Sequence, residues 1–254
     1  MIILKSEKEI EQQREACQIV GQVLKSLKEA AKPGVTTKDL DDLAARMTKE
    51  NNAIPAFKGV RARGPYQPFP GVICSSVNEE VIHGIPSNRE LKEGDIVSID
   101  FGVLYNGFYG DAAVTIPVGK ISEKTQRLLD VTSESLNEAI KQAVAGNRLS
   151  DISHAVQSYV EEKGFSVVRD FVGHGIGRNL HEEPQVPNFG PPGRGVKLKA
   201  GMVLAIEPMI NEGNYDVTVL DDGWTTSTTD GKLSAHFEHT VAITKNKPIV
   251  LTKI

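Results

Sequence analysis

The sequence predicts an α+β fold made of two related halves, and three observations indicate it. Four segments carry apolar residues at helical spacing. Short runs of β-branched residues between turn signals occupy much of the remaining chain. Residues 91–100 resemble residues 198–207, with Leu, Lys, Gly and Ile at matching places and a carboxylate at the end of each. We therefore expect a duplicated helix–helix–strand unit, whose pseudo-twofold relation would bring Asp100 and Glu207 to a shared centre.

The expected helices form two pairs. A capping box over residues 6–9 starts the first helix, and Pro33-Gly34 ends it. The second helix is shorter and begins near Thr37, with its apolar residues on one face. The helices of the second pair span residues 122–144 and 150–163, and a glycine follows each of them closely.

Strands are expected mainly after each helix pair. Residues 95–103 have the composition of a buried strand, and Asn106-Gly107 predicts a hairpin to a second strand within 107–118. Residues 51–71 are rich in Pro, Gly and Arg and predict a long loop, which in a compact domain is more often functional than inert. In the second half, strands are expected at 203–206, at 215–220, and in a hairpin around 230–231 that leads into 237–244.

Composition excludes several classes of protein. The chain has 254 residues, of which 39% are hydrophobic and 24% charged, and its formal net charge is -4. It therefore lacks the basic footprint of a nucleic-acid-binding protein. Two cysteines are too few for a disulfide scaffold or a cysteine-built zinc site. Because no apolar run is long enough for a signal-peptide core or a membrane span, we expect a single cytoplasmic domain over residues 1–254.

Four acidic residues stand in apolar, strand-like surroundings, namely Asp100, Asp111, Glu207 and Glu238. A buried carboxylate is costly unless it is paired or binds a cation. For any one of these residues, a strand end or a solvent-facing position is the simpler interpretation. For all four together that interpretation is weaker, because like charges cannot be buried close together without cations.

Histidines offer a second kind of ligand. His174 lies in a glycine-rich segment, residues 172–178, where the backbone can come close to a bound group. His181 follows it at a spacing that does not match a helical zinc motif. For His174 alone, a structural role in the loop is the alternative. Oxygen ligands with one imidazole suit a pair of divalent cations such as Mn, Fe, Co or Zn. Two such ions can polarise a carbonyl and activate a water.

Segments spread over essentially the whole chain resemble type I methionine aminopeptidases. Their order and spacing make the resemblance specific, although each segment alone is a moderate signal. The motifs of P-loop, serine-hydrolase and C-x-x-C redox enzymes are absent from the sequence. The matching segments are residues 73–86, 94–100, 107–111, 173–178, 181–184, 206–208 and 238–240.

The resemblance implies the pita-bread fold of the creatinase and aminopeptidase families, in which duplicated halves surround a curved antiparallel sheet. It implies two divalent metal ions, which could be Co, Mn, Fe, Zn or Ni. A monovalent cation near Ser98 and Ser234 is a further implication. The residues that match the metal ligands of the family are Asp100, Asp111, His174, Glu207 and Glu238.

The resemblance also implies an activity. The enzyme would remove the N-terminal methionine of nascent proteins and peptides whose second residue is small, through attack by a hydroxide that bridges the metals. Glu207 would be the general base, with His181 and His83 as catalytic partners at the scissile peptide group. The implied partners are nascent N-termini and the ribosome, and a monomer without membrane or nucleic-acid binding is expected. The residues expected to contact the substrate are His83, His181, Cys74, Phe69 and Trp224.

Three alternatives remain open from the residues. A prolidase or an aminopeptidase P would share the fold, but those enzymes carry a large extra N-terminal domain and a different histidine spacing. A non-catalytic binding protein would have lost metal ligands, whereas all five positions are intact here. A globular protein with scattered acids would take up no metal. The sequence departs from the family in residues 61–70, where a few residues are inserted, and Val60 stands at the first aromatic position.

Overall fold

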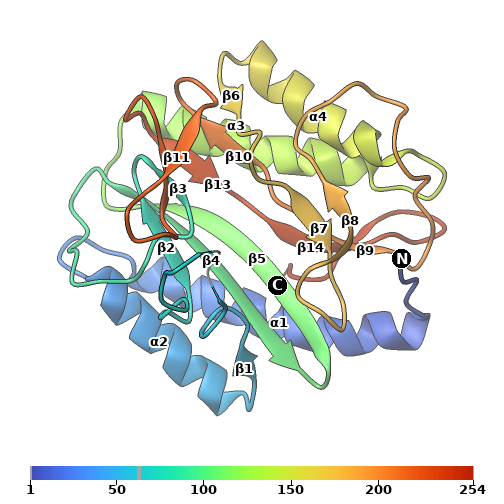
Figure 1. Ribbon diagram of the computed structural model, residues 1–254, viewed down its shortest axis with the longest axis horizontal. Helices are drawn as coiled ribbons and strands as arrows, with labels where there is room; N and C mark the ends of the chain where they lie inside the picture. The colour runs from blue at the N-terminus through green and yellow to red at the C-terminus, as the bar shows by residue number, and fades with distance from the viewer. Residues whose placement is uncertain (1, 62–63, 254) are drawn as a thin grey trace.

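Two pairs of helices flank a group of antiparallel sheets in the computed structural model, which describes residues 2–61 and 64–253 (Figure 1). Figure 1 shows the first pair along one side of the molecule and the second pair along the opposite side, with two long strands crossing between them. The prediction of four helices in two pairs is confirmed. Their bounds are α1 Glu7–Ala30, α2 Thr37–Glu50, α3 Glu123–Gln142 and α4 Leu149–Glu162.

The helices begin where their caps predict. The Ser6 hydroxyl accepts the backbone N–H of Glu9 at 3.3 Å, and the Glu9 carboxylate accepts the backbone N–H of Ser6 at 3.0 Å, which completes the expected capping box. The α2 helix has a second capping box between Thr36 and Asp39. Such boxes satisfy N–H groups that have no partner inside the helix.

The first sheet is built on a long hairpin. Strands β4 (Ile96–Tyr105) and β5 (Phe108–Pro117) pair along their whole length and join at the predicted turn, where Asn106 has φ 48° and Gly107 has φ 79°. Both values lie in the left-handed region that a two-residue hairpin turn requires. The β4 strand also pairs with β2 (Cys74–Val77) and with the short β1 (Ile54–Pro55).

The second half contributes a five-stranded sheet in the order β15-β14-β9-β7-β8. Two smaller sheets have three strands each, in the orders β13-β10-β6 and β11-β12-β3. The bounds are β3 Glu80–Ile82, β6 Ser166–Val167, β7 Gly173–Gly175, β8 Glu182–Val186, β9 Val203–Ile206, β10 Met209–Asn211, β11 Val217–Val219, β12 Thr226–Thr228, β13 Ser234–His236, β14 His239–Ala242 and β15 Ile249–Val250.

The predicted hairpin around residues 230–231 is wrong. The chain does turn there, and the Asp230 carboxylate accepts the backbone N–H groups of Lys232 at 3.1 Å and Asn214 at 2.9 Å. However, β12 pairs with β11 and β3, whereas β13 pairs with β10, so the strands on the two sides of the turn belong to different sheets. An Asp-Gly pair fixes the turn, but the pairing of such short strands depends on distant segments.

The internal repeat of the sequence corresponds to a repeat of structure. Gly94 and Gly201 occupy the same place in the two repeat segments and have φ of 93° and 94°. Each helix pair is tied to its repeat segment by an equivalent hydrogen bond, in which the glycine between the two helices donates to the first leucine of the segment. These bonds are Gly34 to Leu91 at 2.8 Å and Gly146 to Leu198 at 3.0 Å.

Each helix pair covers a hydrophobic core of its own. The first core joins α1 and α2 to β2 and β4 through buried side chains such as Leu27 and Phe101. The second joins α3 and α4 to β9 and its neighbours through residues such as Leu128 and Ile152. A smaller cluster around Cys17 packs α1 against the five-stranded sheet and so connects the halves. Within the described ranges, no helix has the length and apolar character needed to cross a membrane.

Candidate metal centre and substrate pocket

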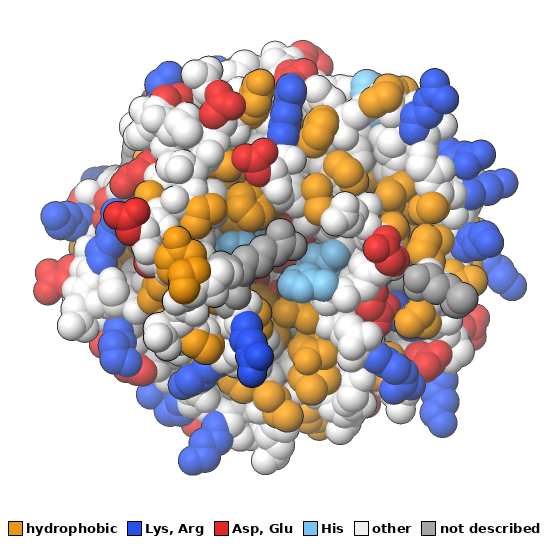
Figure 2. Space-filling model, in the orientation of Figure 1, with side chains coloured by type: hydrophobic (Ala, Val, Ile, Leu, Met, Phe, Trp, Pro, Cys, Tyr) orange, Lys and Arg blue, Asp and Glu red, His pale blue; other side chains and the backbone are white. Residues whose placement is uncertain are grey.

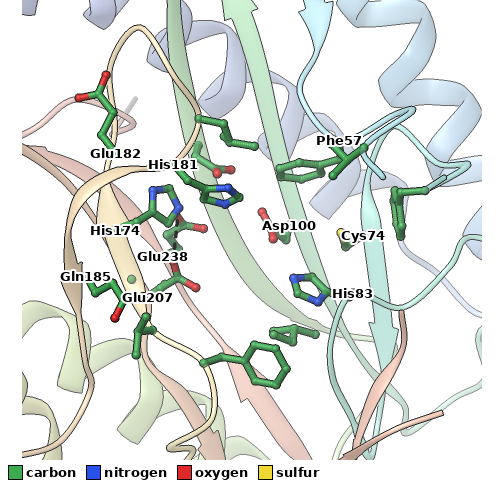
Figure 3. Close-up of a pocket in the computed structure, with 18 of the residues that line it drawn as sticks. Phe57, Cys74, His83, Asp100, His174, His181, Glu182, Gln185, Glu207 and Glu238 are labelled. Carbon is green, nitrogen blue, oxygen red and sulfur yellow. Dashed lines mark ion pairs between the residues drawn. The ribbon is translucent and has the colours of Figure 1, made fainter. Parts of the chain in front are cut away.

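A cavity of about 580 Å³ is lined by residues from both halves of the chain. Figure 2 shows a hollow near the middle of one face of the molecule, with histidine side chains beside it. In the close-up, Asp100 lies between His174 and His181 on one side and Cys74 and His83 on the other (Figure 3). The acids and histidines that line the cavity are Asp100, Asp111, Glu207, Glu238, His83, His174 and His181, together with Glu182 and Glu183.

Asp100 and Asp111 come from the β4–β5 hairpin. Asp111 lies opposite Gly102 in the ladder, two residues beyond Asp100, so both carboxylates project from the same face. Gly102 leaves room for this arrangement, because a Cβ there would lie 3.0 Å from Oδ1 of Asp111. The Asp111 backbone is fixed in turn by Thr240, whose hydroxyl donates to the Asp111 carbonyl at 2.7 Å.

The other three expected ligands come from neighbouring strands of the five-stranded sheet. His174 is the middle residue of β7, Glu207 directly follows β9, and Glu238 directly precedes β14. Because β9 pairs with both β7 and β14, these three positions meet at one end of the sheet. The Glu238 backbone N–H donates to the Ala113 carbonyl at 2.9 Å, which brings this end against the β4–β5 hairpin.

His174 is oriented for coordination through one nitrogen. Its Nδ1 lies 2.9 Å from the Gly175 carbonyl, so this nitrogen carries the proton and donates. The free electron pair is then on Nε2, which lies 3.6 Å from Oε1 of Glu207. A backbone carbonyl that fixes the tautomer in this way is the usual outer partner of a metal-binding histidine.

The residues present fit a divalent metal. One ligand atom each of Asp111, His174 and Glu238 lie within 4.8 Å of one another. Three buried carboxylate oxygens have no hydrogen-bond partner among the described residues, namely Oδ1 of Asp100, Oδ1 of Asp111 and Oε1 of Glu238. Buried polar atoms without partners are rare, and here all three belong to one cluster. Oxygen donors with one imidazole match divalent cations of the first transition row.

Burial governs the protonation of this cluster. It raises the pKa of Asp100 to about 7. It also raises the pKa of Asp111, Glu207 and Glu238 well above their usual values, and the negative charges of neighbouring carboxylates raise them further. The cluster therefore holds protons when no cation neutralises it. Burial has the opposite effect on the imidazole of His174, whose pKa falls to about 4.

His83 and His181 approach the cluster from two sides. The His181 ring lies 4.5 Å from that of His174 in an edge-to-face arrangement. His83 has φ 59°, a left-handed conformation that is uncommon for a residue with a side chain and that recurs at functional sites. Burial lowers the pKa of His83 to about 4 and lowers the pKa of His181, so both rings are neutral at pH 7.

Aromatic side chains form the opposite wall of the cavity. Phe69 packs edge-to-face on Trp224, with ring centroids 5.2 Å apart, and the Trp224 indole N–H donates to the Gln67 carbonyl at 2.9 Å. Cys74 lies directly opposite Asp100 in the β2–β4 ladder. Burial raises the pKa of the Cys74 thiol well above its usual value, which leaves it a small neutral side chain in the same cavity as these rings. The predicted pocket residues therefore share one cavity.

Ser98 and Ser234 are both buried and already hydrogen-bonded within the protein. The hydroxyls of Ser98 and Thr115 are 2.8 Å apart, and the Ser234 hydroxyl donates to the Asn211 side chain at 2.8 Å. The monovalent cation site near these serines stays a prediction.

Some lining residues carried no signal in the sequence. They are apolar or uncharged side chains in loops and short strands, and residues of these types indicate no function by themselves. Val60, at the departure from the family pattern, and Phe57 both line the cavity. Within the predicted insertion, Ala62 and Arg63 lie outside the described residues. The cavity residues that sequence reasoning missed are Ile82, Phe171, Val172 and Gln185.

Comparison with known proteins agrees with this geometry. The sequence model of the family described as "Metallopeptidase family M24" matches residues 11–245. The chain belongs to metallopeptidase family M24. It is 58% identical to the methionine aminopeptidase of Clostridium perfringens and 54% identical to methionine aminopeptidase 1 of Bacillus subtilis, with 100% of each chain covered in both cases.

Solved structures of this family have the same fold. The crystal structure of methionine aminopeptidase from Thermotoga maritima superposes with a TM-score of 0.95 at 49% identity, covering 100% of both chains. The prolidase of Pyrococcus furiosus gives a TM-score of 0.78 at 25% identity, and the match covers 99% of this chain but 66% of the prolidase. The expected pita-bread fold and the resemblance to methionine aminopeptidases are confirmed. About a third of the prolidase lies outside the match.

Proposed function

We propose that this M24 enzyme removes the N-terminal methionine from peptides and nascent proteins whose second residue is small. The observation that carries the proposal is one cavity that holds a metal-binding cluster at one wall and an apolar, aromatic pocket at the other. The full-length similarity to several methionine aminopeptidases supports the same substrate. An unbranched thioether chain suits a pocket of aromatic rings and a neutral thiol.

The metal centre is proposed to hold two divalent ions, with Co, Mn, Fe, Zn and Ni as candidates. Asp100, Asp111, His174, Glu207 and Glu238 would be their ligands. When bound, such ions would supply Lewis-acid polarisation of the scissile carbonyl and an activated water at neutral pH. Their positive charge would also hold the four acids in the ionised form despite burial.

Glu207 is the proposed general base and proton shuttle. Its side chain is largely buried, and one of its oxygens lies 3.6 Å from Nε2 of His174, at the edge of the cluster. A carboxylate in that place can take a proton from the attacking water and deliver it to the leaving amine.

The two neutral imidazoles are proposed to bind the peptide group. His181, beside His174, would donate a hydrogen bond to the carbonyl oxygen as negative charge develops on it. His83 would hold the scissile nitrogen and assist its protonation. Its ring packs edge-to-face against Phe171, with centroids 5.7 Å apart, which narrows the space for the second residue.

Cleavage after the first residue of the substrate follows from the positive charge of its free α-amino group. The free α-amino group would lie against the carboxylates and the metals, while the first side chain fills the aromatic pocket. We further propose a single catalytic domain over residues 1–254 that acts as a cytoplasmic monomer. Its substrates would be N-termini emerging from the ribosome, and no membrane or nucleic acid is involved.

The test is a peptide panel on metal-stripped protein with each cation restored in turn. We expect Met-Ala-Ser to be cleaved and Xaa-Pro peptides to be poor substrates. Glu207→Gln should reduce kcat by roughly a hundredfold or more, because it removes the base. Preferential cleavage of Xaa-Pro peptides would refute the proposal in favour of a prolidase-like activity, which the P. furiosus neighbour makes the second candidate. Undiminished turnover by the variant would refute the role of Glu207.

A further inference from the structure

The loop that carries His181 is fixed from outside the cavity. His181 ends the segment between β7 and β8, and among the described residues its imidazole has no hydrogen bond of its own. Its position in the cavity therefore depends on the backbone of residues 176–181. Figure 3 shows the His181 ring directed to the centre of the site, while the side chain of the next residue, Glu182, points away from it.

The Glu182 carboxylate closes this loop with both of its oxygens. Oε1 accepts the backbone N–H of Arg178 at 2.9 Å and that of Asn179 at 3.2 Å. Oε2 accepts a hydrogen bond from Nζ of Lys5 at 2.6 Å. The carboxylate thus joins the start of the loop to its end, and it is held in place by a residue 177 positions away in the sequence.

The Lys5–Glu182 pair is buried and anchored at both ends. The side chains are only 4% and 5% exposed, unlike the other Lys and Arg ion pairs among the described residues. The Lys5 backbone N–H donates to the Gly201 carbonyl at 2.8 Å, directly before the cap of α1. A Cβ on Gly177 would collide with the end of the Lys5 side chain, so the lysine passes closely over the loop.

We propose that Lys5 is a positioning residue for His181, acting through Glu182, and this rests on the proposed function. The physical reason is that a buried carboxylate without its cation cannot keep the same place, because it would be left uncompensated. It would turn toward solvent, and the N–H groups of Arg178 and Asn179 would lose their acceptor. The loop would then relax and carry His181 away from the scissile carbonyl.

The decisive variant is Lys5→Met, which keeps an unbranched side chain and removes the charge. We expect kcat for Met-Ala-Ser to fall by roughly tenfold and KM to change by less than about twofold, because an interaction made in the transition state is lost. In a His181→Ala background the same substitution should change kcat by less than about twofold, since the two residues act as a unit. Lys38→Met, which breaks the exposed pair with Asp42, is the matched control and should leave kcat unchanged.

A second readout does not depend on activity. Hydrogen exchange of the Arg178 and Asn179 amides should be at least about tenfold faster in Lys5→Met than in the wild type or the Lys38→Met control. The double variant Lys5→Met with Glu182→Gln has no unpaired charge and keeps an acceptor oxygen, so it should recover part of the lost kcat. If Lys5→Met alone does not fold, kcat and amide exchange are measured in this double variant instead.

Two results would overturn the proposal. One is a lower melting temperature with unchanged kcat and unchanged amide exchange, which would make Lys5 a merely stabilising residue. The other is an equal loss of kcat in the wild-type and His181→Ala backgrounds. Failure of the proposed function would look different, because His181→Ala would then leave turnover intact or the wild type would not cleave Met-Ala-Ser. Amide exchange would still decide the role of Lys5.

Discussion

Among single residues, the buried acids dominate the chemistry of this enzyme. Asp100 and Asp111 share one face of a hairpin, and burial makes each of them hold a proton more tightly. Such a cluster opposes folding when it is charged and favours it when cations or protons neutralise it. The acids proposed as metal ligands are therefore a source of instability in the metal-free protein.

Asp100→Asn should test this consequence through the pH dependence of stability. Burial raises the pKa of Asp100 from 3.8 to about 7, so between these values the folded state holds a proton that the unfolded state has lost. The stabilising contribution of Asp100 is then present below pH 3.8 and is lost as pH rises toward 7. Asparagine does not titrate, so in urea unfolding with a chelator the variant should gain stability relative to the wild type over this range.

A stability difference that does not change with pH would contradict this prediction. Added Mn²⁺ should reverse the order of the two proteins at pH 7, because the metal stabilises the wild type by binding the folded state. Asparagine keeps the shape of the side chain but not its charge, so the variant should bind the metal more weakly.

The charged residues of the candidate site were identified from the sequence, and the structure brings them into one cavity. Acids such as Glu207 were recognisable because a carboxylate buried in an apolar strand costs free energy unless it is paired or binds a cation. Phe171 and Gln185 were not, because an aromatic or amide side chain in a loop is common and marks nothing by itself. Lys5 was equally hidden, since its partner Glu182 lies 177 residues away and only the fold brings them together.

Among the elements, β5 both carries a residue of the candidate metal site and packs against α1. One of its residues, Asp111, faces the metal site, while the residue before it, Gly110, packs directly on the backbone of α1. A Cβ on Gly110 would lie 2.7 Å from the Cys17 nitrogen and 2.9 Å from the Ala16 carbonyl carbon. The absence of a side chain at Gly110 therefore sets how closely α1 supports the strand that carries Asp111.

Gly110→Ala should move α1 away from β5 and weaken metal binding as well as stability. We expect a loss of roughly 1–3 kcal/mol in the free energy of unfolding, as in other overpacked sites, and a higher dissociation constant for Mn²⁺. Gly231→Ala is the control, because a Cβ there meets nothing within 4 Å and only its φ of 69° is unfavourable. Calorimetric titration of both variants checks this, and equal Mn²⁺ affinities would contradict it.

Helices were predictable from the sequence to within a few residues, because periodicity and caps act locally. The α1 helix starts at its capping box, and β4 and β5 meet at their Asn-Gly turn. The strands of two or three residues were harder, since a pair such as β10 and β13 is held by contacts distant in sequence. The wrong hairpin at residues 230–231 has this cause.

For the whole molecule, duplication explains why the site exists where it does. The segments that end in Asp100 and Glu207 have the same glycine conformation and equivalent hydrogen bonds to their helix pairs. The two repeat segments therefore deliver one carboxylate each to the same cavity. The repeat predicted this convergence, but it did not predict the order of strands around it, because that order depends on how the two halves pack.

The most direct test of the account is anomalous diffraction from crystals of the protein grown with Mn²⁺. We predict two manganese peaks inside the cluster formed by Asp100, Asp111, His174, Glu207 and Glu238, roughly 3.5–4 Å apart, the separation that two-metal hydrolases show. A single peak would contradict the two-ion centre. Manganese bound only elsewhere would contradict the metal site as a whole.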